Sequence, residues 1–571
     1  MVALPLMAWH ALPEPNPKLT KQLRMTTQTS LHPLVVKHLQ SLGFQGTQEM
    51  MRFLFPKKEH LHTPWRLKGM EEAVRLLEAA ITGGQHITVV GDYDVDGVCG
   101  TTIAVGALER LGAQVDFYLP HRKKEGYGIK PIVVERLKER GTEVVVTVDN
   151  GITAQAAVEA ARQAGITTII TDHHQPGETL PEADVLINPN QAGCPYPFKG
   201  ICGAGVAYKL GQALYEYLGM DPDEMEERFL PYVTIATIAD VMPLRDENRY
   251  LVQEGLRRMR KKPPRFLKAL LKVLQMDIRQ LSEESIGFYI APTLNAPGRL
   301  DSAEDALRLL RAQTPLEAAM MANVCHEHNR RRQALVEAAL QQAKPALTTE
   351  DVQVLSLDVE EGIAGIVAGH VKERLQRPTF IFSPAHTAQG ELILKGSARS
   401  IPGFSLFEAL QAVAVQHPTW FINWGGHAMA AGVSLDPHHL ESFRQAINEV
   451  YRQQGGKSSA VPTHTFLATI TEEEAETIVD LLAPLAPFGM GNPRPRFEIE
   501  TSFRDRQVFG AKQNHLRLHS EQGFEYTWFR GGTMAIPLDR PTHAYVTLGR
   551  SFFAGRERLD RLIEDVRPLD S

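Results

Sequence analysis

The stretch HITVVGDYDVDG (86–97) decides the fold of the first half of the chain. It begins with an apolar, β-branched run, which favours a short buried strand, and it continues into three aspartates. EVVVTVDNG (143–151) and TTIITDHH (167–174) repeat the pattern, each ending in acidic or histidine side chains. Between them lies a helical stretch with Thr153 as its predicted N-cap and Gly165 just past its end. Short buried strands that alternate with helices predict a parallel sheet covered by helices.

The polar side chains that follow these strands are expected to meet, because residues just beyond the C-terminal ends of parallel strands lie along one edge of a sheet. Five aspartates at close range cannot all be ionised without a counter-charge, since each raises the pKa of its neighbours. A divalent cation supplies that charge. Asp240 closes a further apolar run, ATIAD, and is the candidate for a fourth contributing segment. The converging residues are Asp92, Asp94, Asp96, Asp149, Asp172, His173 and His174.

The kinds of ligand predict the kind of metal. Aspartate and histidine without cysteine argue against a structural zinc site. Carboxylates suit Mg²⁺ and Mn²⁺, whereas imidazole shifts the balance towards ions softer than Mg²⁺. We therefore expect two ions, Mn²⁺ or Mg²⁺, bridged by a shared carboxylate, an arrangement that suits in-line attack on phosphorus. A lone acid at a strand end is usually a turn former or a helix cap, but three such motifs at successive strand ends favour a metal site.

Length and composition set wider limits. The 571 residues suggest about three or four domains. Lys and Arg number 61 against 67 Asp and Glu, so the whole chain has no basic footprint for nucleic acid, although local patches stay open. The four cysteines have no C-x-x-C spacing, which fits reduced thiols rather than a disulfide scaffold. We find no signal peptide and no apolar run long enough to span a membrane, and we expect a cytoplasmic protein.

A long connecting helix is predicted near the middle of the chain. Thr314 is its N-cap, Pro315 occupies its first turn, and Glu317 completes a capping box. The helical pattern can run to about Ala343, which is longer than most helices of globular proteins. Such a helix is typical of a connector between domains.

Two further domains are expected beyond this helix. A second α/β region extends from about 352 to 451, and a Gly/Ser-rich hinge follows at 453–460. After about Phe497, short aromatic-rich runs predict a small all-β domain. GAGVAYK (203–209) lacks the third glycine of a dinucleotide-binding fingerprint and follows no clear strand, so we reject that interpretation.

Together these motifs resemble a known family. GDYDVDG, VDNG and TDHH are similar to motifs of the DHH phosphoesterase superfamily. APTLNAPGRL (291–300), KGSARSIPGF (395–404) and GGHAMAAG (425–432) resemble the bacterial RecJ single-strand-specific exonucleases, in the same order. LAPFGMGNPRPRF (485–497) and the N-terminal segment also look RecJ-like, so the resemblance covers nearly the whole chain.

The resemblance implies an α/β multidomain fold and an activity. The activity is 5′ to 3′ degradation of single-stranded DNA to mononucleotides with Mn²⁺ or Mg²⁺, in DNA repair and recombination. Its implied partners are single-stranded DNA with a 5′ end, single-strand-binding protein and a RecQ-type helicase. The implied parts are an N-terminal helical extension (1–85), a DHH catalytic domain with a parallel sheet (86–300), a connecting helix (301–345), a DHHA1 α/β domain (346–455) and an OB-fold β-barrel (461–571).

The resemblance also implies roles for the clustered residues. Asp149 is implied to be the bridging metal ligand and thereby part of the catalytic centre. His174 matches a catalytic histidine near the scissile phosphate, where it stabilises developing charge or serves as an acid. The residues that match metal-ligand positions of the family are Asp94, Asp96, Asp149, His173 and Asp240.

The first metal site departs from the pattern of the wider superfamily. Many DHH enzymes carry a histidine ligand four residues before Asp94, and here that position is Val90. RecJ-like members also lack this histidine. Asp92 is the residue expected to compensate, which leaves the ligand set of the first metal open.

Residues for the DNA are expected outside the acidic motifs. In KGSARS, Lys395, Ser397 and Arg399 offer donors that suit a phosphate. Taken alone, this hexapeptide is typical of a strand edge with solvated charges, but the RecJ resemblance implies contact with the terminal 5′-phosphate. Arg122 is the second candidate for that phosphate; the neighbouring Lys123 and Lys124 are compatible with a solvated basic turn.

Three more residues are candidates for DNA or phosphate binding. His427 lies in GGHAMAAG, whose glycines permit close approach of backbone to a ligand, although a tight packing motif is the alternative. Asn295 and Arg299 fit either phosphate contacts or inter-domain clamps. In the C-terminal region, aromatics interleaved with arginines fit single-strand binding by stacking, but many of these rings must fill the core of a barrel.

Two other functions compete with the exonuclease. A phosphatase for small substrates such as pyrophosphate, short oligonucleotides or cyclic dinucleotides fits the metal motifs, but it does not need the C-terminal β domain. A non-catalytic scaffold in replication or repair fits the fold, but inactive relatives usually lose metal ligands, and here all three motifs are intact.

Overall fold

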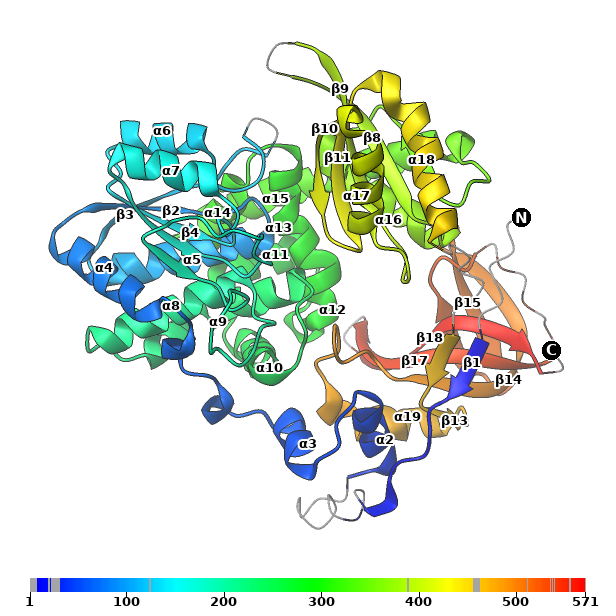
Figure 1. Cartoon of the computed structure of the whole chain (residues 1–571). Coiled ribbons are helices and arrows are strands. Elements are labelled where there is room, and N and C mark those ends of the chain that lie inside the picture. The colour runs from blue at the N-terminus through cyan, green and yellow to red at the C-terminus, as the bar shows by residue number, and fades with distance from the viewer. Residues whose placement is uncertain are drawn as a thin grey trace. The chain divides into compact units, whose positions relative to one another are not determined.

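The computed structural model divides into two compact units (Figure 1). One unit holds the described residues of 1–118, 129–291 and 461–571, and the other holds those of 119–128 and 292–460. Lys123, Lys124 and most of the predicted hinge lie outside the described residues. The structure describes the chain except for residues 1–7, 19–20, 22–30, 123–124, 388–389, 455–462, 511, 533, 535, 537, 539, 554–555 and 570–571.

The first unit contains the predicted parallel sheet. Its five strands run in the order β3-β2-β4-β5-β6, and every pairing between them is parallel. Apolar β-branched residues fill the central strand β4, which is buried along its whole length. The strands are β2 (His86–Val90), β3 (Gln114–Tyr118), β4 (Val144–Val148), β5 (Thr167–Thr171) and β6 (Val185–Ile187).

Helices cover this sheet. Helices α6 (Pro131–Glu139) and α7 (Gln155–Ala164) pack together in one apolar cluster with residues of β2 and β4. The predicted N-cap of α7 was wrong by one residue: Ala154 caps it, because residues 151–154 form a turn closed by the bond from the Ala154 N–H to the Gly151 carbonyl. Gly165 ends it with φ 73°, as predicted. A second helical layer comprises α4 (Met70–Thr82), α5 (Val95–Arg110), α8 (Gly203–Tyr217), α9 (Asp223–Ala239), α10 (Asp246–Lys261) and α11 (Arg265–Val273).

The C-terminal part of this unit is a β-barrel. The strand order β13-β14-β15-β16-β18-β17 closes through a further pairing of β14 with β17. Aromatic rings fill its core, among them Phe503, Tyr526 and Trp528, whereas Phe529 is 57% exposed. The strands are β13 (Ala468–Ile470), β14 (Arg496–Phe509), β15 (His515–Ser520), β16 (Glu525–Trp528), β17 (Pro541–Phe553) and β18 (Arg556–Pro568).

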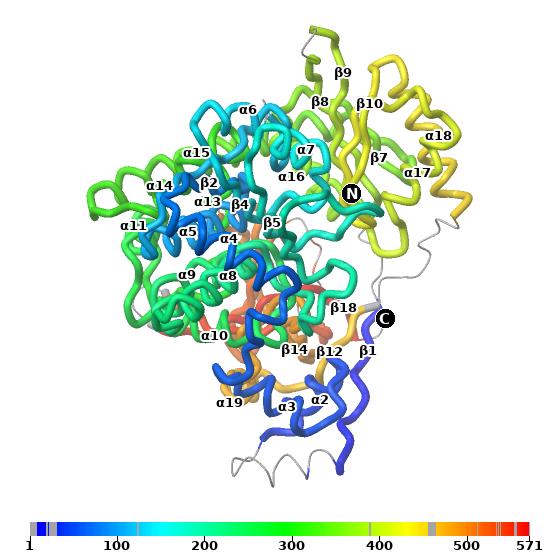
Figure 2. Tube along the Cα trace, turned by 60° about the vertical axis from the view of Figure 1, so that its left-hand side comes forward, coloured from blue at the N-terminus to red at the C-terminus, as the bar shows by residue number. Residues whose placement is uncertain are grey.

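The N-terminal segment packs on this barrel. Besides the expected short helices, α2 (Pro33–Ser41) and α3 (Thr47–Leu54), it contains a strand, β1 (Ala8–Ala11). That strand pairs in parallel with β12 (Thr463–Phe466), and the two segments lie side by side in Figure 2. The apolar faces of α2 and α3 share one core with the barrel. Both ends of the chain therefore build the same part of the first unit.

The second unit begins near α13 (Ala291–Leu300) and contains the predicted long helix. This helix, α15 (Pro315–Ala346), starts where expected, since the Glu317 N–H donates to the Thr314 side chain at 3.1 Å. A mixed sheet follows in the order β10-β11-β9-β8-β7, with α16 (Glu361–Leu375), α17 (Leu406–Gln416) and α18 (Leu440–Gln453). The strands are β7 (Gln353–Ser356), β8 (Thr379–His386), β9 (Leu392–Arg399), β10 (Phe421–Gly426) and β11 (Ala430–Leu435).

Candidate metal centre

The acidic and histidine motifs meet at the carboxyl edge of the parallel sheet. They follow β2, β4 and β5, and Asp240 joins them from the C-terminal end of α9. Within each of three overlapping groups, one potential ligand atom of every residue lies within 4.8 Å of the others. All six predicted metal ligands belong to these groups, and so does His174. The groups are Asp149, His173 and His174; Asp96, His173 and Asp240; and Asp92, Asp94 and Asp149.

His173 lies at the centre of the cluster. Its Nε2 is 3.1 Å from an Asp149 carboxylate oxygen and 3.6 Å from oxygens of both Asp96 and Asp240. An imidazole nitrogen surrounded by carboxylate oxygens from three separate segments is a donor set that fits Mn²⁺ or Mg²⁺. The side chains present therefore fit the predicted cations.

Asp96 is oriented by the first turn of another helix. Its two carboxylate oxygens accept the N–H groups of Gly203 at 2.7 Å and Ala204 at 2.8 Å, at the start of α8. Gly203 also leaves room for Asp149, because a Cβ at that position would lie 2.5 Å from the Asp149 Cβ. The GAGVAYK segment thus supports the cluster. The sequence predicted no role for it, since its closeness to Asp149 arises only in the folded chain.

Asp149 occupies a tight turn after β4. Its backbone has φ 64°, which is unusual for a residue with a side chain. Its N–H donates to the Thr171 carbonyl at 3.1 Å, and the buried amide of Asn150 donates to the carbonyls of Val90 and Val148 at 3.0 and 2.9 Å. These bonds join the ends of β2, β4 and β5, so the turn places the Asp149 carboxylate in the cluster. Asn150 belongs to VDNG, but the sequence pattern predicted no role for it.

Asp172 orients neighbouring residues through hydrogen bonds. Its carboxylate accepts the N–H groups of Ile152, His173 and His174 at 3.0, 2.7 and 3.1 Å. It also lies 2.8 Å from Nδ1 of His174, which fixes the orientation of that ring. Burial raises the pKa of Asp172, but the bonds with His174 and the backbone donors outweigh it and lower the pKa.

His174 is the charged counterpart of Asp172. Burial lowers its pKa, but the hydrogen bond and the charge of Asp172, together with the charges of Asp240 and Asp96, raise the pKa to about 9. The neighbouring carboxylates therefore favour the protonated imidazole in the metal-free protein. For His173 burial is the dominant influence, and it lowers the pKa.

The remaining carboxylates show the repulsion expected from their closeness. Burial first, and then the charges of its aspartate neighbours, raise the pKa of Asp149 well above its usual value. Burial and the charges of Asp96 and Asp94 raise the pKa of Asp240 to about 8. A group of acids that resist ionisation together is stabilised by a bound cation.

Val90 and Asp92 are the two residues that left the ligand set of the first metal open in the sequence. The Val90 side chain is fully buried in the core that β2 shares with α6 and α7. Asp92 is 3% exposed and groups with Asp94 and Asp149. Its position is compatible with the compensating role predicted for it.

The predicted phosphate-binding residues belong to the second unit, whereas the metal cluster belongs to the first. Lys395, Ser397 and Arg399 alternate along β9 with the buried Leu394, Gly396 and Ala398, so the three polar side chains share one face of the sheet. On β11, Gly432 pairs with Ser397, and it is exposed. The polar donors of β9 thus lie beside a position of β11, Gly432, that has no side chain.

Lys395 and Arg399 differ in their partners. The Lys395 ammonium lies 3.1 Å from the Glu361 carboxylate. Among the residues that the structure describes, no carboxylate lies within ion-pair distance of Arg399, whose guanidinium packs over Gly365 of α16. Burial and the positive charge of Arg122 lower the pKa of Arg399. Two cations next to each other favour an anion at this position.

The other three predicted contacts lie on α13 and in the turn between β10 and β11. Arg299 donates from Nη1 to the Gly362 carbonyl at 3.2 Å and so fastens α13 to the first turn of α16. Asn295 lies one helical turn before it on α13. His427 is exposed in the turn between β10 and β11, where its N–H donates to the Ala430 carbonyl at 2.8 Å.

The helices of the described chain include none that is long and apolar enough to cross a membrane.

Comparison with known proteins gives consistent matches along the chain. Family models match for the DHH family N-terminal domain at residues 86–237, the DHHA1 domain at 349–453 and the RecJ OB domain at 468–565. The chain is 33% identical over 579 residues to the single-stranded-DNA-specific exonuclease RecJ of Haemophilus influenzae, covering 96% of this chain and 99% of that protein.

Two further relatives agree. The chain is 36% identical over 511 residues to the single-stranded-DNA-specific exonuclease RecJ of Bacillus subtilis, covering 88% of this chain but only 63% of that protein. The crystal structure of RecJ from Thermus thermophilus in complex with Mn²⁺ superimposes with a TM-score of 0.83 at 30% identity, covering 99% of this chain and 80% of that one.

Proposed function

This chain belongs to the RecJ family of DHH phosphoesterases, and we propose on that basis that it is a metal-dependent exodeoxyribonuclease. Its substrate is single-stranded DNA, which it degrades from the 5′ end to mononucleotides in DNA repair and recombination. The observation that carries the proposal is the cluster at the sheet edge, where three overlapping groups contain all six predicted metal ligands.

The residues of the cluster divide into two ligand sets around a shared carboxylate. Asp92 and Asp94 group with Asp149, and Asp96 and Asp240 group with His173, which itself lies 3.1 Å from an Asp149 oxygen. We assign Asp149 as the bridge, because it is the aspartate common to two of the groups. These residues would hold two divalent cations, and the bound ions would supply an activated water and positive charge for the phosphate.

The chain itself supplies a proton and a positive charge beside the cluster. Asp172 accepts from Nδ1 of His174 and fixes the ring, and its negative charge favours the protonated imidazole. His174 can then stabilise charge that develops on the phosphate or donate a proton to the leaving oxygen. Asp172 is thus the residue that orients this acid.

The polar face of β9 binds the 5′-phosphate. Arg399 and Ser397 are the main contacts, and Arg122 adds positive charge next to Arg399. Lys395 contributes less, because Glu361 already neutralises it. Holding the terminal phosphate specifies the end from which the strand is digested.

The other predicted contacts have different surroundings. Asn295 and His427 remain candidate DNA contacts. Arg299 is a candidate contact that is already tied to the Gly362 carbonyl, which supports the clamp alternative for this residue.

The organisation and setting predicted from the sequence complete the proposal. The domains are divided at 1–85, 86–300, 301–345, 346–455 and 461–571. The protein acts in the cytoplasm, and its partners besides single-stranded DNA are single-strand-binding protein and a RecQ-type helicase.

Digestion of end-labelled DNA with Mn²⁺ tests the activity. A 5′-phosphorylated 30-nucleotide strand should release a 5′ label at once as mononucleotide and a 3′ label only at the end, and EDTA should stop both reactions. The same strand in a blunt duplex is the matched control and should stay intact. Early release of the 3′ label, or equal attack on the duplex, contradicts the proposal; cleavage confined to oligonucleotides of two to five residues supports the small-substrate phosphatase instead.

A further inference from the structure

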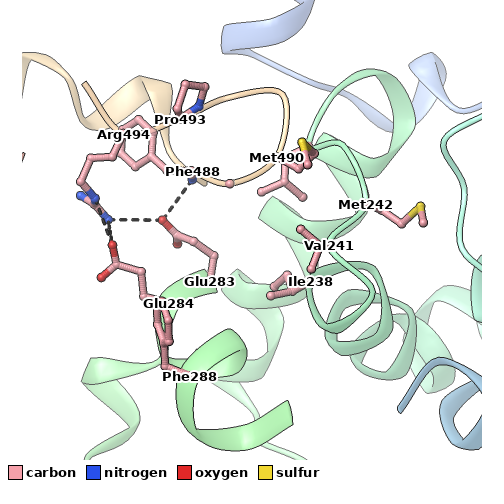
Figure 3. Close-up of a pocket in the computed structure, with 12 residues that line it drawn as sticks. Ile238, Val241, Met242, Glu283, Glu284, Phe288, Phe488, Met490, Pro493 and Arg494 are labelled. Atoms are coloured by element: carbon pink, nitrogen blue, oxygen red, sulfur yellow. Dashed lines mark hydrogen bonds and ion pairs between the residues drawn. The ribbon is translucent and has the colours of Figure 1, made fainter. Parts of the chain in front are cut away.

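A loop from the C-terminal region is hydrogen-bonded to the chain just after Asp240. We name residues 485–494, which precede β14, the GMGNP loop. The Leu244 N–H donates to the Met490 carbonyl at 2.8 Å, and Nε of Arg245 donates to the Gly491 carbonyl at 2.8 Å. Figure 3 shows Met490 of this loop facing Val241 and Ile238 at the end of α9. The loop is thus bonded to the residues four and five positions after Asp240, a proposed metal ligand. In the sequence, the loop lies about 250 positions after these residues.

Two glycines permit this close approach. A Cβ at position 489 would lie 2.9 Å from Cδ1 of Leu244. Gly491 has φ 73°, a conformation that strains other residues. The GMGN sequence therefore has a local physical reason, which the proposed reaction itself does not explain.

The GMGNP loop is held from several directions. Buried Asn492 donates to the carbonyls of Leu485 and Pro487 at 2.7 and 2.8 Å, and His38 of α2 lies 3.0 Å from its side-chain oxygen. The Phe488 N–H donates to the Glu283 carboxylate at 3.0 Å, one of the contacts drawn in Figure 3. A loop fixed in this way can serve as a rigid anchor for the segment it contacts.

Asp240 differs from Asp96 and Asp172 in how its carboxylate is held. The carboxylates of Asp96 and Asp172 are oriented by backbone N–H groups. In the described part of the chain, Oδ2 of Asp240 accepts no hydrogen bond, although it points towards His173. Its direction therefore depends on its backbone, and metal ligands must be held to within about 0.5 Å.

The backbone at Asp240 leaves α9 in a strained turn. Asp240 caps the helix, and its N–H still donates to the Ala236 carbonyl at 2.9 Å. Val241 has φ 55°, which is unfavourable for a β-branched residue and persists only where surrounding contacts fix it. Leu244 and Arg245, bonded to the GMGNP loop, fix the chain on the far side of this turn.

We propose that the GMGNP loop positions Asp240 for metal binding, with Arg245 as the positioning residue that transmits the constraint. The inference rests on the metal site of the proposed function. It assigns a role in metal affinity to a segment of the C-terminal region that donates no ligand.

Manganese binding by the full chain tests this inference without reference to nuclease activity. Free Mn²⁺ is counted by electron paramagnetic resonance during titration of the protein. Arg245→Gln should weaken binding about tenfold, as loss of an outer-shell partner typically does. Arg257→Gln is the matched control, since this exposed arginine of α10 lies outside the GMGNP loop and pairs with Glu254 at 2.6 Å; its Mn²⁺ affinity should stay within about twofold of the wild type.

A double-mutant cycle separates positioning from general destabilisation. In an Asp240→Asn background, Arg245→Gln should cause no further loss of Mn²⁺ affinity, because the residue it acts through is already changed. Arg245→Lys, which keeps one donor, should restore part of the affinity and guards against a glutamine variant that does not fold. Full affinity in Arg245→Gln, or an equal loss in both backgrounds, overturns the inference. Failure of the wild type to bind Mn²⁺ refutes the proposed metal site instead.

Discussion

The metal cluster and the polar face of β9 are built in opposite ways. The cluster collects like charges from the ends of three strands and a helix, buries them, and so raises the pKa of Asp149 and Asp240. The β9 face collects donors along a single strand by simple alternation. One region needs a cation and the other needs an anion.

This difference shows how each region can fail. In the cluster every residue depends on its neighbours, so a single change in geometry affects all ligands. On β9 Lys395 pairs with Glu361 and Arg399 packs over Gly365, so removal of one of these side chains leaves the other in place. We therefore expect large, cooperative effects in the cluster and smaller, separable effects on β9.

The largest effect is expected at Asp149. Asp149→Asn removes the carboxylate shared by two groups and should lower nuclease turnover on the order of 10³-fold or more. Asp277→Asn, which removes an exposed carboxylate that pairs with Arg279, is the control and should leave turnover unchanged. DNA binding should remain measurable in both variants by fluorescence anisotropy. Normal turnover of Asp149→Asn would remove the metal assignment.

A change that adds one methyl group should have the next largest effect. Gly203→Ala places a Cβ 2.5 Å from the Asp149 Cβ, so the carboxylate must move. We expect Mn²⁺ affinity, measured by titration calorimetry, to fall by 10- to 100-fold, roughly as for loss of an outer-shell partner. Gly369→Ala in α16 is the control, because a Cβ there meets nothing within 4 Å. Equal affinities in the two variants would show that the cluster tolerates displacement.

On β9, the two basic residues should behave differently. Arg399→Met should raise the KM for 5′-phosphorylated strands about tenfold and leave the KM for 5′-hydroxyl strands nearly unchanged, since a charged hydrogen bond contributes about 1.5 kcal/mol. Lys395→Met is the matched control, and we expect less than about a threefold change because Glu361 already pairs with this lysine. Equal effects of the two substitutions would contradict the distinction drawn between them.

The smallest effect concerns pH and stability. Without metal, Asp240 holds a proton up to about pH 8, whereas an unfolded chain releases it near pH 4. The folded state binds more protons in this interval, so the stability of the metal-free protein falls as the pH rises from about 4 to about 8. Mn²⁺ takes the place of the proton. The increase in Tm on adding Mn²⁺ should therefore be a few degrees larger at pH 8 than at pH 6, and Asp240→Asn should reduce that difference.

The strand-end residues could be predicted because topology alone brings them together. Once 86–90, 144–148 and 167–171 are parallel neighbours, their following residues share one edge. The order of the strands does not indicate which backbone N–H group orients which carboxylate. The bonds from Gly203 and Ala204 to Asp96 join segments 107 and 108 positions apart and leave no pattern in the sequence.

On β9 the sequence identified the residue types but not their partners. Lys395 and Arg399 have the same charge in KGSARS, and only the fold brings Glu361 to one and Arg122 towards the other. Strand β1 was missed for a related reason, since its partner β12 lies at the other end of the chain. Local patterns predict elements and faces, and long-range pairing decides what each face meets.

The pairing of the two chain ends has a consequence for biosynthesis. Trp9 donates to Asp565, 556 positions later, and the apolar faces of α2 and α3 share a core with the barrel. At about 5 to 20 residues per second, a ribosome needs roughly half a minute to two minutes between these residues. The helices α2 and α3 are therefore made before the barrel that buries their apolar faces. Until the barrel has been made, their apolar faces lack this partner, and such exposed surface is what chaperones recognise in general.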